Sequence, residues 1–283
     1  MAGLVAGASF DCSVSFAISA NETDAILSRI KSVTDLIVDG YVLKIHGGRL
    51  KASVQLSTDE PPIVPAIPEK LATVPAGFIE SLKVASKFIG DVRWSAGVRL
   101  YQNRITAASK AVAIDITLEG LDSPIPVMLT KAAVLFLISQ PAPLQYAVNA
   151  NTVFFKWAND RWLSAQLLND MMPEAIVKGV FDKVAGDCPI PITDETRAAC
   201  ADAIALSEGK LWITKGGFEG RKGVAKTFCE CPMDLPEDHC SAWGAADIEA
   251  MMTCATAWNL AQWPEPVGFI GPNIRGAISG IRA

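Results

Sequence analysis

The feature that most constrains this chain is a tight turn that recurs five times along it. Each turn is rich in Gly or Asn and lies between two extended apolar runs. Gly and Asn readily adopt the positive φ of a tight hairpin, so each turn predicts a pair of antiparallel strands. The turns occupy 47–50, 102–105, 149–153, 208–211 and 271–274, and the strands expected before them span 41–45, 98–101, 144–148, 203–206 and 267–270.

A segment with helical periodicity lies upstream of every turn. Apolar residues three or four apart predict a helix that buries one face. In the fourth segment Thr193 is the expected N-cap, and Asp194 and Glu195 follow in the first turn. The expected helices cover 22–34, 75–89, 130–139, 193–198 and 245–257, and short strands are expected before them at 14–18, 70–74, 125–129, 189–192 and 240–243.

The repeating unit is therefore a strand, a helix and two or three antiparallel strands, which predicts an α+β fold. The spacing between turns varies from 48 to 64 residues, which argues against a solenoid of fixed period. Pro-rich joints fall at 61–75 and 172–191. We expect a truncated first domain with one unit at 1–70, and two domains of two units each at 71–180 and 181–283.

Composition limits the setting in which the chain works. Its 283 residues carry 25 Lys and Arg against 30 Asp and Glu, a formal net charge of −5, and half of them are hydrophobic. The longest apolar run, 132–138, is far shorter than the roughly 18 residues of a membrane span. With no basic signal region and an odd seven Cys, we expect a reduced, cytoplasmic protein without membrane partners. The acidic balance by itself argues against nucleic-acid binding.

Several segments taken in order resemble one family. The segments at 78–82, 98–100, 103–107, 127–129, 161–168 and 172–174 resemble the middle domain of the bacterial sliding clamp, the beta subunit of DNA polymerase III. The last hundred residues, down to a C-terminal strand at 274–283, resemble the third domain of that clamp. The resemblance covers about residues 70–283 and rests on the order of the motifs and on the repeat count.

The resemblance implies a DNA-clamp fold, with helices lining one side of curved sheets, in a homo-oligomeric ring around duplex DNA. It implies a non-enzymatic protein without cofactors that tethers DNA polymerase and meets a clamp loader through short peptide motifs. Family rings close with twelve half-domain units, and five units per chain do not divide into twelve. A divergent, phage-encoded clamp fits such a truncation. The alternative is a clamp-derived interaction or inhibitor protein that binds replication factors without encircling DNA.

If the helices face DNA, their exposed sides should carry cations that neutralise phosphates. Helix 75–89 offers Lys83 and Lys87, opposite its apolar face, while the first and third helices offer Arg29 and Lys131. The last two helices are net acidic. We therefore predict duplex-DNA contacts at Arg29, Lys83, Lys87 and Lys131, with an ordinary solvated face as the alternative.

The family's client pocket is implied at two segments of this chain. The stretch 107–112 matches a pocket segment of the middle domain, with Lys110 in place of a His and Val112 keeping an apolar wall. The C-terminal stretch 279–283 matches a second segment, in which Ile281 and Arg282 agree in kind. Because apolar sub-pockets and exposed backbone accept an extended peptide, changed walls imply changed clients. An ordinary edge strand is the alternative.

One group of residues has the types needed for zinc. Cys229, Cys231, His239 and Cys240 make up a Cys₃His set, but their spacing differs from the common knuckles. Packing of the cysteines as small apolar residues is the favoured alternative. His239 beside Cys240 also suggests a thiol nucleophile and its base, yet neighbours in a chain seldom face each other correctly. We expect neither a metal nor a catalytic residue, and zinc at this group remains an open alternative.

Overall fold

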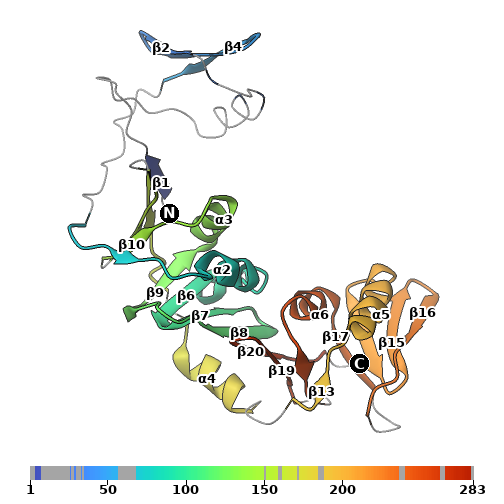
Figure 1. The fold of residues 1–283 in the computed structure, drawn as a ribbon. Coiled ribbons are helices and arrows are strands. Elements are labelled where there is room, and N and C mark those ends of the chain that lie inside the picture. Colours follow the sequence, from blue (N-terminus) through green and yellow to red (C-terminus); the bar gives the residue numbers. More distant parts are fainter. Residues whose placement is uncertain are drawn as a thin grey trace. The chain divides into compact units, whose positions relative to one another are not determined.

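The computed structural model describes residues 4–7, 26, 29, 33, 35–56, 68–149, 151–158, 161–170, 172–183, 188–235, 240–261 and 265–281 (Figure 1). The chain forms two compact units. The larger unit contains Met1–Ala8 and Pro68–Ala283, and the smaller unit contains Ser9–Ile67. No described helix is both long and apolar enough to cross a membrane.

The smaller unit contains one antiparallel sheet of three strands. These are β2 (Asp35–Asp39), β3 (Val42–Gly47) and β4 (Leu50–Gln55), in that order. The predicted turn at 47–50 is confirmed, and Gly48 adopts the expected positive φ of 59°. Leu43, Ile45, Val54 and Leu56 form a small core against which Ile26 packs. The predicted strand 14–18 lies outside the described residues, and of the predicted helix 22–34 only Ile26, Arg29 and Val33 are described.

The first pair of repeats in the larger unit follows the predicted order closely. Its short strands and helices are β5 (Ala72–Thr73), α2 (Phe78–Ser86), the 3₁₀ turn η1 (Arg93–Ser95), and α3 (Lys131–Ser139). Its longer strands are β6 (Gly97–Gln102), β7 (Arg104–Ala108), β8 (Val112–Thr117), β9 (Ser123–Thr130), β10 (Gln145–Val148), β11 (Thr152–Lys156) and β12 (Trp162–Gln166). The predicted hairpins at 102–105 and 149–153 are confirmed.

The second pair of repeats completes the larger unit. It begins with β13 (Ile190–Pro191), α5 (Asp194–Ala205), β14 (Lys210–Thr214), β15 (Gly217–Lys222) and β16 (Ala225–Glu230). It continues with β17 (Cys240–Gly244), α6 (Ala245–Met252), β18 (Ala257–Trp258), β19 (Val267–Gly271) and β20 (Ile274–Ile278). The predicted cap is confirmed, because Thr193 Oγ1 accepts a hydrogen bond from the Thr196 backbone N–H at 3.1 Å.

In the larger unit, the first strand of each repeat pairs with the sheet of the other repeat in the same pair. Thus β5 pairs with β10 while β9 pairs with β6, and β13 pairs with β18 while β17 pairs with β14. The strand β1 (Leu4–Gly7) pairs with β12 at the far edge of its sheet. In the smaller unit β2 remains an edge strand, and no described strand pairs with its open side. The exchange shows why two repeats make one domain.

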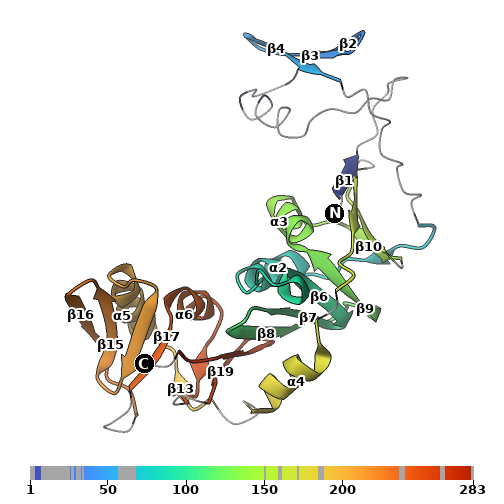
Figure 2. The same ribbon diagram turned by 180° about the vertical axis from the view of Figure 1, so that it is seen from behind.

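One sheet runs through both pairs of repeats. Its eight strands lie in the order β13-β18-β19-β20-β8-β7-β6-β9, and the antiparallel β8–β20 pair joins the two pairs of repeats. On one face of this sheet, apolar side chains such as Leu100, Ile105 and Ile114 pack in a single hydrophobic core with residues of α2, α3, α5 and α6. On the opposite face of this sheet, α4 (Glu174–Lys183) packs over the part that contains β7 and β8, as both ribbon views show (Figures 1 and 2).

The structure corrects two local predictions. The segment 203–206, predicted as a strand, forms the end of α5, because the helix started by Thr193 continues through Ala205. Short apolar runs do not distinguish strand from helix by pattern alone. The turn predicted at 208–211 therefore joins α5 to β14 and is not a hairpin. The hairpin of this repeat lies between β14 and β15, at Lys215 and Gly216. The predicted helix 245–257 ends at Met252, because Ala257 pairs with both Pro191 and Ile270 in the long sheet.

The Pro-rich stretch 172–191 contains a helix that was not predicted from the sequence. We interpreted this stretch only as a joint, but α4 spans ten of its residues. Glu174 stands in the first turn, where an acidic side chain favours a helix start. Phe181 is buried with Ala108, Ala113, Met128 and Met172, and Val180 packs beside them. Burial against the sheet therefore stabilises a helix whose sequence is flanked by helix-breaking prolines.

Candidate client pocket and nucleic-acid face

A cavity of about 230 Å³ lies where β8 meets β20. Its floor is a row of small side chains, because Ala108, Ala113 and Ala277 stand directly opposite one another on β7, β8 and β20. Three methyl groups in a row leave room that larger residues would fill. The cavity is therefore built by the pairing of β8 from the first pair of repeats with β20 from the second.

The turn between β7 and β8 forms one wall of this cavity. Lys110 and Val112, two of the four residues predicted for the client pocket, both line it. The Ser109 hydroxyl holds the turn by accepting hydrogen bonds from the backbone N–H groups of Ala111 and Val112, each at 3.2 Å. The backbone N–H of Ser279 donates to the Ala111 carbonyl at 2.7 Å, which fastens the C-terminal strand to the turn.

Of the two other residues predicted for the pocket, only Ile281 is described, and it lies elsewhere. Ile281 donates its backbone N–H to the Ala242 carbonyl at 2.8 Å, at the edge of β17. It is not among the residues that line the cavity, and Arg282 lies outside the described residues.

Two further residues that line the cavity were not predicted from the sequence. Trp94 comes from η1 and Val180 comes from α4. An amphipathic pattern within 174–183 was the available signal for Val180. No local pattern distinguishes Trp94 from the other six Trp of the chain.

The predicted cations of the larger unit lie on its helices. Lys83 is exposed on α2 with its Nζ 3.8 Å from Glu80 Oε1, and the exposed Lys87 donates to Thr253 Oγ1 at 3.0 Å. Lys131 is the exposed first residue of α3, directly after its N-cap Thr130. Since α2 packs against α3, the structure brings these lysines onto neighbouring helices. Arg29 is exposed in the smaller unit.

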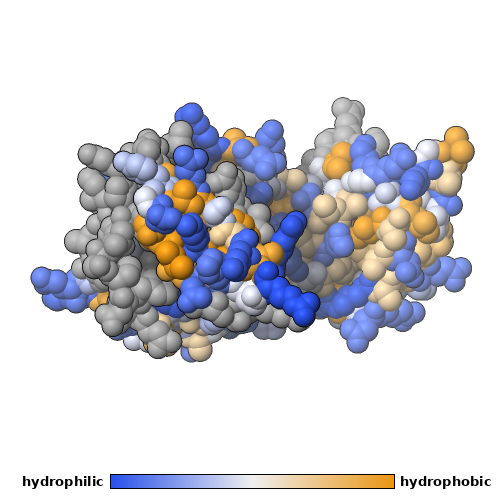
Figure 3. Space-filling view, turned by 90° about the horizontal axis from the view of Figure 1, so that it is seen from above, coloured by the Kyte–Doolittle hydropathy of each residue, from blue (hydrophilic) through white to orange (hydrophobic). Residues whose placement is uncertain are grey.

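The helices of the second pair carry the opposite charge. Asp194, Glu195 and Asp202 are exposed on α5, and Glu249 is exposed on α6. Arg197 is the cation among them, and its guanidinium donates to the Ala255 carbonyl at 2.6 Å. Burial raises the pKa of Asp247 in the first turn of α6. Viewed from above, the described surface mixes hydrophilic and apolar residues (Figure 3). The helical face is thus basic over the first pair and acidic over the second.

The cysteines of the candidate zinc group are dispersed. Cys231 is buried and its thiol donates to Thr196 Oγ1 at 3.7 Å, Cys229 is half-buried on β16, and Cys240 is exposed. Burial, with the Asp202 carboxylate nearby, raises the pKa of the Cys229 thiol. Among the described residues no three His, Cys, Asp or Glu side chains form a metal-binding group. His239 lies outside those residues.

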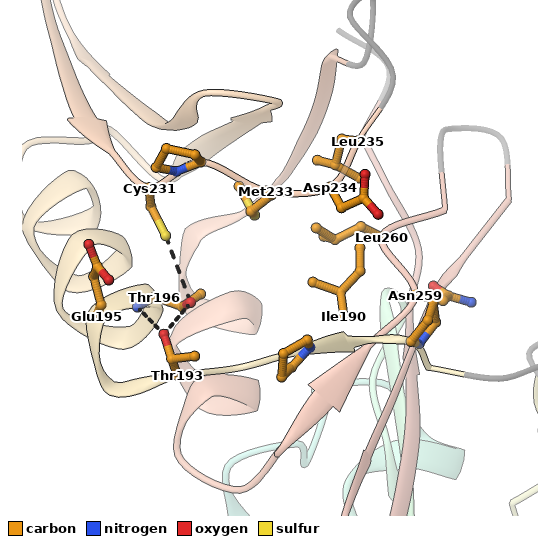
Figure 4. A pocket seen from close by; sticks show the side chains of 13 residues that line it. Ile190, Thr193, Glu195, Thr196, Cys231, Met233, Asp234, Leu235, Asn259 and Leu260 are labelled. Carbon is orange, nitrogen blue, oxygen red and sulfur yellow. Dashed lines mark hydrogen bonds between the residues drawn. The ribbon is translucent and has the colours of Figure 1, made fainter.

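Another cavity, of about 690 Å³, lies beside the start of α5. Figure 4 shows Ile190, Met233, Leu235 and Leu260 grouped across it from Thr193 and Thr196. The hydroxyls of Thr193 and Thr196 are 2.9 Å apart and hydrogen-bonded to each other. Its described lining contains two carboxylates, Glu195 and Asp234, and no cation. We find no arrangement for catalysis in it.

Repeats that exchange first strands, with their helices along one side of a continuous sheet, define the fold class of the DNA sliding clamps. Comparison with solved structures supports this class. The DNA polymerase III beta subunit of Thermotoga maritima matches with a TM-score of 0.72 at 13% identity, over 95% of this chain and 81% of that one. The predicted α+β clamp fold is thereby confirmed.

Two other bacterial clamps match over a similar length. The Helicobacter pylori beta clamp, bound to a DNA ligase peptide, matches with a TM-score of 0.70 at 16% identity, over 94% of this chain and 81% of that one. The Pseudomonas aeruginosa sliding clamp matches with a TM-score of 0.69 at 11% identity, over the same shares of the two chains. No family model and no curated protein sequence matches this chain.

Proposed function

We propose that this chain is a sliding-clamp-like processivity factor of DNA replication, which encircles duplex DNA and tethers replication proteins. The observation that carries the proposal is the cavity at the β8–β20 junction, where Lys110 and Val112 meet the small-residue floor. Such a cavity accepts apolar side chains of an extended peptide beside exposed backbone groups. The clients that we expect are a DNA polymerase and a clamp loader, in the cytoplasm of a host that carries a divergent, phage-encoded clamp.

Lys83, Lys87 and Lys131 on adjacent helices support contact with the DNA backbone. Each phosphate that a lysine neutralises releases counterions, so the contact is independent of sequence and sensitive to salt. The acidic helices α5 and α6 weaken the attraction on the other pair of repeats. A ring that slides needs weak, non-specific contacts, and the net charge of −5 suits this better than tight static binding.

Open sheet edges support a homo-oligomeric ring. The edge strand β16 exposes half of the Phe228 side chain, and the edge strand β2 exposes 54% of Leu36. Unpaired edges with exposed apolar side chains favour pairing with another chain. We infer that β16 of one copy pairs with the sheet of the smaller unit in the next copy.

The polymerase test uses the double charge reversal Lys83→Glu with Lys87→Glu. On primed circular template, the wild-type protein should lengthen the products of its polymerase, and the double variant should lose that effect. The slope of log affinity for DNA against log salt should fall by about 2. Lys222→Glu, at the exposed end of β15, is the matched control and should behave as wild type. An unaffected double variant would contradict the assignment of these lysines.

The second candidate is a clamp-derived interaction or inhibitor protein that does not encircle DNA. The three-stranded sheet of the smaller unit favours it, because no described strand completes that sheet. Light scattering separates the two candidates: a closed oligomer supports the clamp, and a monomer that never associates with circular DNA supports the interaction protein. Binding of the ligase peptide, a first client probe, is expected in both cases.

A further inference from the structure

A second cavity, of about 240 Å³, opens on the flank of α4 opposite the client pocket. Its floor is the neighbouring row of the same sheet face, two residues along each strand and therefore about 7 Å away. In this row Arg99, Thr106, Asp115 and Arg275 stand directly opposite one another on β6, β7, β8 and β20. Arg104 from β7 and Lys178 from α4 add two more cations. The lining carries four cations and three carboxylates, so one positive charge is in excess.

Asp115 fixes two of the guanidinium groups. Its carboxylate is 4% exposed and accepts hydrogen bonds from Arg104, from Arg275 Nε at 3.1 Å and from Thr106 Oγ1 at 3.1 Å. Arg275 also lies over the ring of Phe181, 4.8 Å from its centroid. The two arginines share one carboxylate, and their side chains remain 37% and 50% exposed. N–H groups that Asp115 does not use are therefore open to a further acceptor.

Arg99 is the least satisfied cation of this cavity. It is 7% exposed and lies 5.0 Å from the centroid of the Tyr101 ring. Its Nε is buried and has no hydrogen-bond partner among the described residues. In the described part of the chain it forms one ion pair, a 3.3 Å contact between Nη2 and Glu174 Oε2, and the Glu174 side chain is 68% exposed. A buried N–H donor without an acceptor lowers the free energy of unfolding, and an ion pair with an exposed carboxylate contributes little to it.

The ion pair between Arg99 and Glu174 and the cation–π contact between Arg275 and Phe181 also hold α4 against the sheet. If these contacts served only to hold α4 on the sheet, the Arg99 Nε would still have no hydrogen-bond acceptor. The one positive charge in excess among the lining residues would also remain unpaired. A small oxyanion would satisfy both, since it offers several acceptor atoms to guanidinium groups in fixed forks. The oxyanion would bind beside Arg99, where a single oxygen of the Glu174 carboxylate now lies.

We propose that this cavity binds a phosphate group on Arg99, Arg104 and Arg275, in competition with the Glu174 carboxylate. The phosphate is either inorganic phosphate or a phosphate monoester on a peptide, because both present the same dianion. Binding displaces Glu174 and changes the attachment of α4, whose Val180 lines the client pocket. None of the residues that line this cavity is one of the lysines proposed to contact DNA, and none lines the candidate client pocket itself.

The test is a titration of the full chain with inorganic phosphate and with phosphoserine amide, followed by calorimetry. We expect Glu174→Gln to tighten phosphate binding about tenfold, because it removes the competing carboxylate, and Arg275→Gln to weaken it about tenfold or more. Arg93→Gln, whose side chain is 90% exposed and outside the cavity, is the matched control and should bind as wild type. Tighter binding of phosphoserine amide than of inorganic phosphate identifies a peptide-borne group, and the reverse identifies the free ion.

Two results would overturn the proposal. One is that neither probe binds the wild-type protein or the Glu174→Gln variant up to about 10 mM, the weak limit of specific small-ligand binding. The other is that Arg93→Gln weakens binding as much as Arg275→Gln, which would indicate only general attraction to surface charge. Arg99→Gln is an added variant, and its thermal unfolding shows whether loss of binding reflects loss of the fold. Activity on primed template is not part of this readout, so the clamp proposal stands or fails separately.

Discussion

The ring of Phe269 occupies the space that a side chain at Gly276 would need, directly across from it on β19 and β20. The same ring stacks on Phe88 at a centroid distance of 6.3 Å, next to α2. Gly276 in turn pairs with Ile114 on β8. The Phe269 ring thus packs at the junction between the two pairs of repeats, and it has room there because Gly276 has no side chain.

Gly276→Ala should therefore destabilise the larger unit. The new methyl group meets the Phe269 ring, and overpacking in a tight core costs about 1–3 kcal/mol. Urea unfolding followed by tryptophan fluorescence measures the loss. Gly179→Ala is the control, because nothing lies within 4 Å of its added Cβ and the residue is in α4. It should be neutral or stabilising by about 0.5–1 kcal/mol. Equal effects of both substitutions would contradict the role of the Phe269–Gly276 pair.

Val180→Asp should weaken client binding by about tenfold or more. Val180 contributes an apolar wall of the proposed client pocket and is only half-buried, so a charge at this position should disrupt the cavity more than the core. Fluorescence anisotropy of the labelled ligase peptide measures the change. Gly179→Ala on the same helix again serves as the control. Unchanged affinity in Val180→Asp would place the client site elsewhere.

Asp247→Asn should remove part of the pH dependence of stability. Burial raises the folded-state pKa of Asp247 above 3.8, so the native state binds the proton more tightly than the unfolded state does. Stability from this group is then present below about pH 4 and is lost as pH rises through the folded-state pKa. Asp247→Asn should be more stable than wild type at pH 7 and not at pH 4, by urea unfolding. The exposed Glu249→Gln is the control, and a less stable Asp247→Asn at pH 7 would refute the argument.

Local sequence predicted the elements whose signals lie within a few residues. Turns such as 102–105 and 271–274 are confirmed because Asn and Gly permit the backbone that a hairpin requires. The helices begun by Thr130 and Thr193 are confirmed because each hydroxyl accepts the N–H three residues ahead. Where local signals were weak, at 203–206 and in α4, the prediction was wrong or incomplete.

The sequence by itself determined the order of elements in the repeating unit, four of the five hairpin turns and the charge of α2, α3, α5 and α6, since these depend on neighbouring residues. Only the tertiary structure decided which strands pair, because a strand's own pattern does not specify its partner. The β8–β20 pairing brings Ala113 opposite Ala277 at the floor of the proposed client pocket, and in the next row it brings Asp115 opposite Arg275. Residues 160 positions apart in the chain thus share one site, through contacts that no local pattern records.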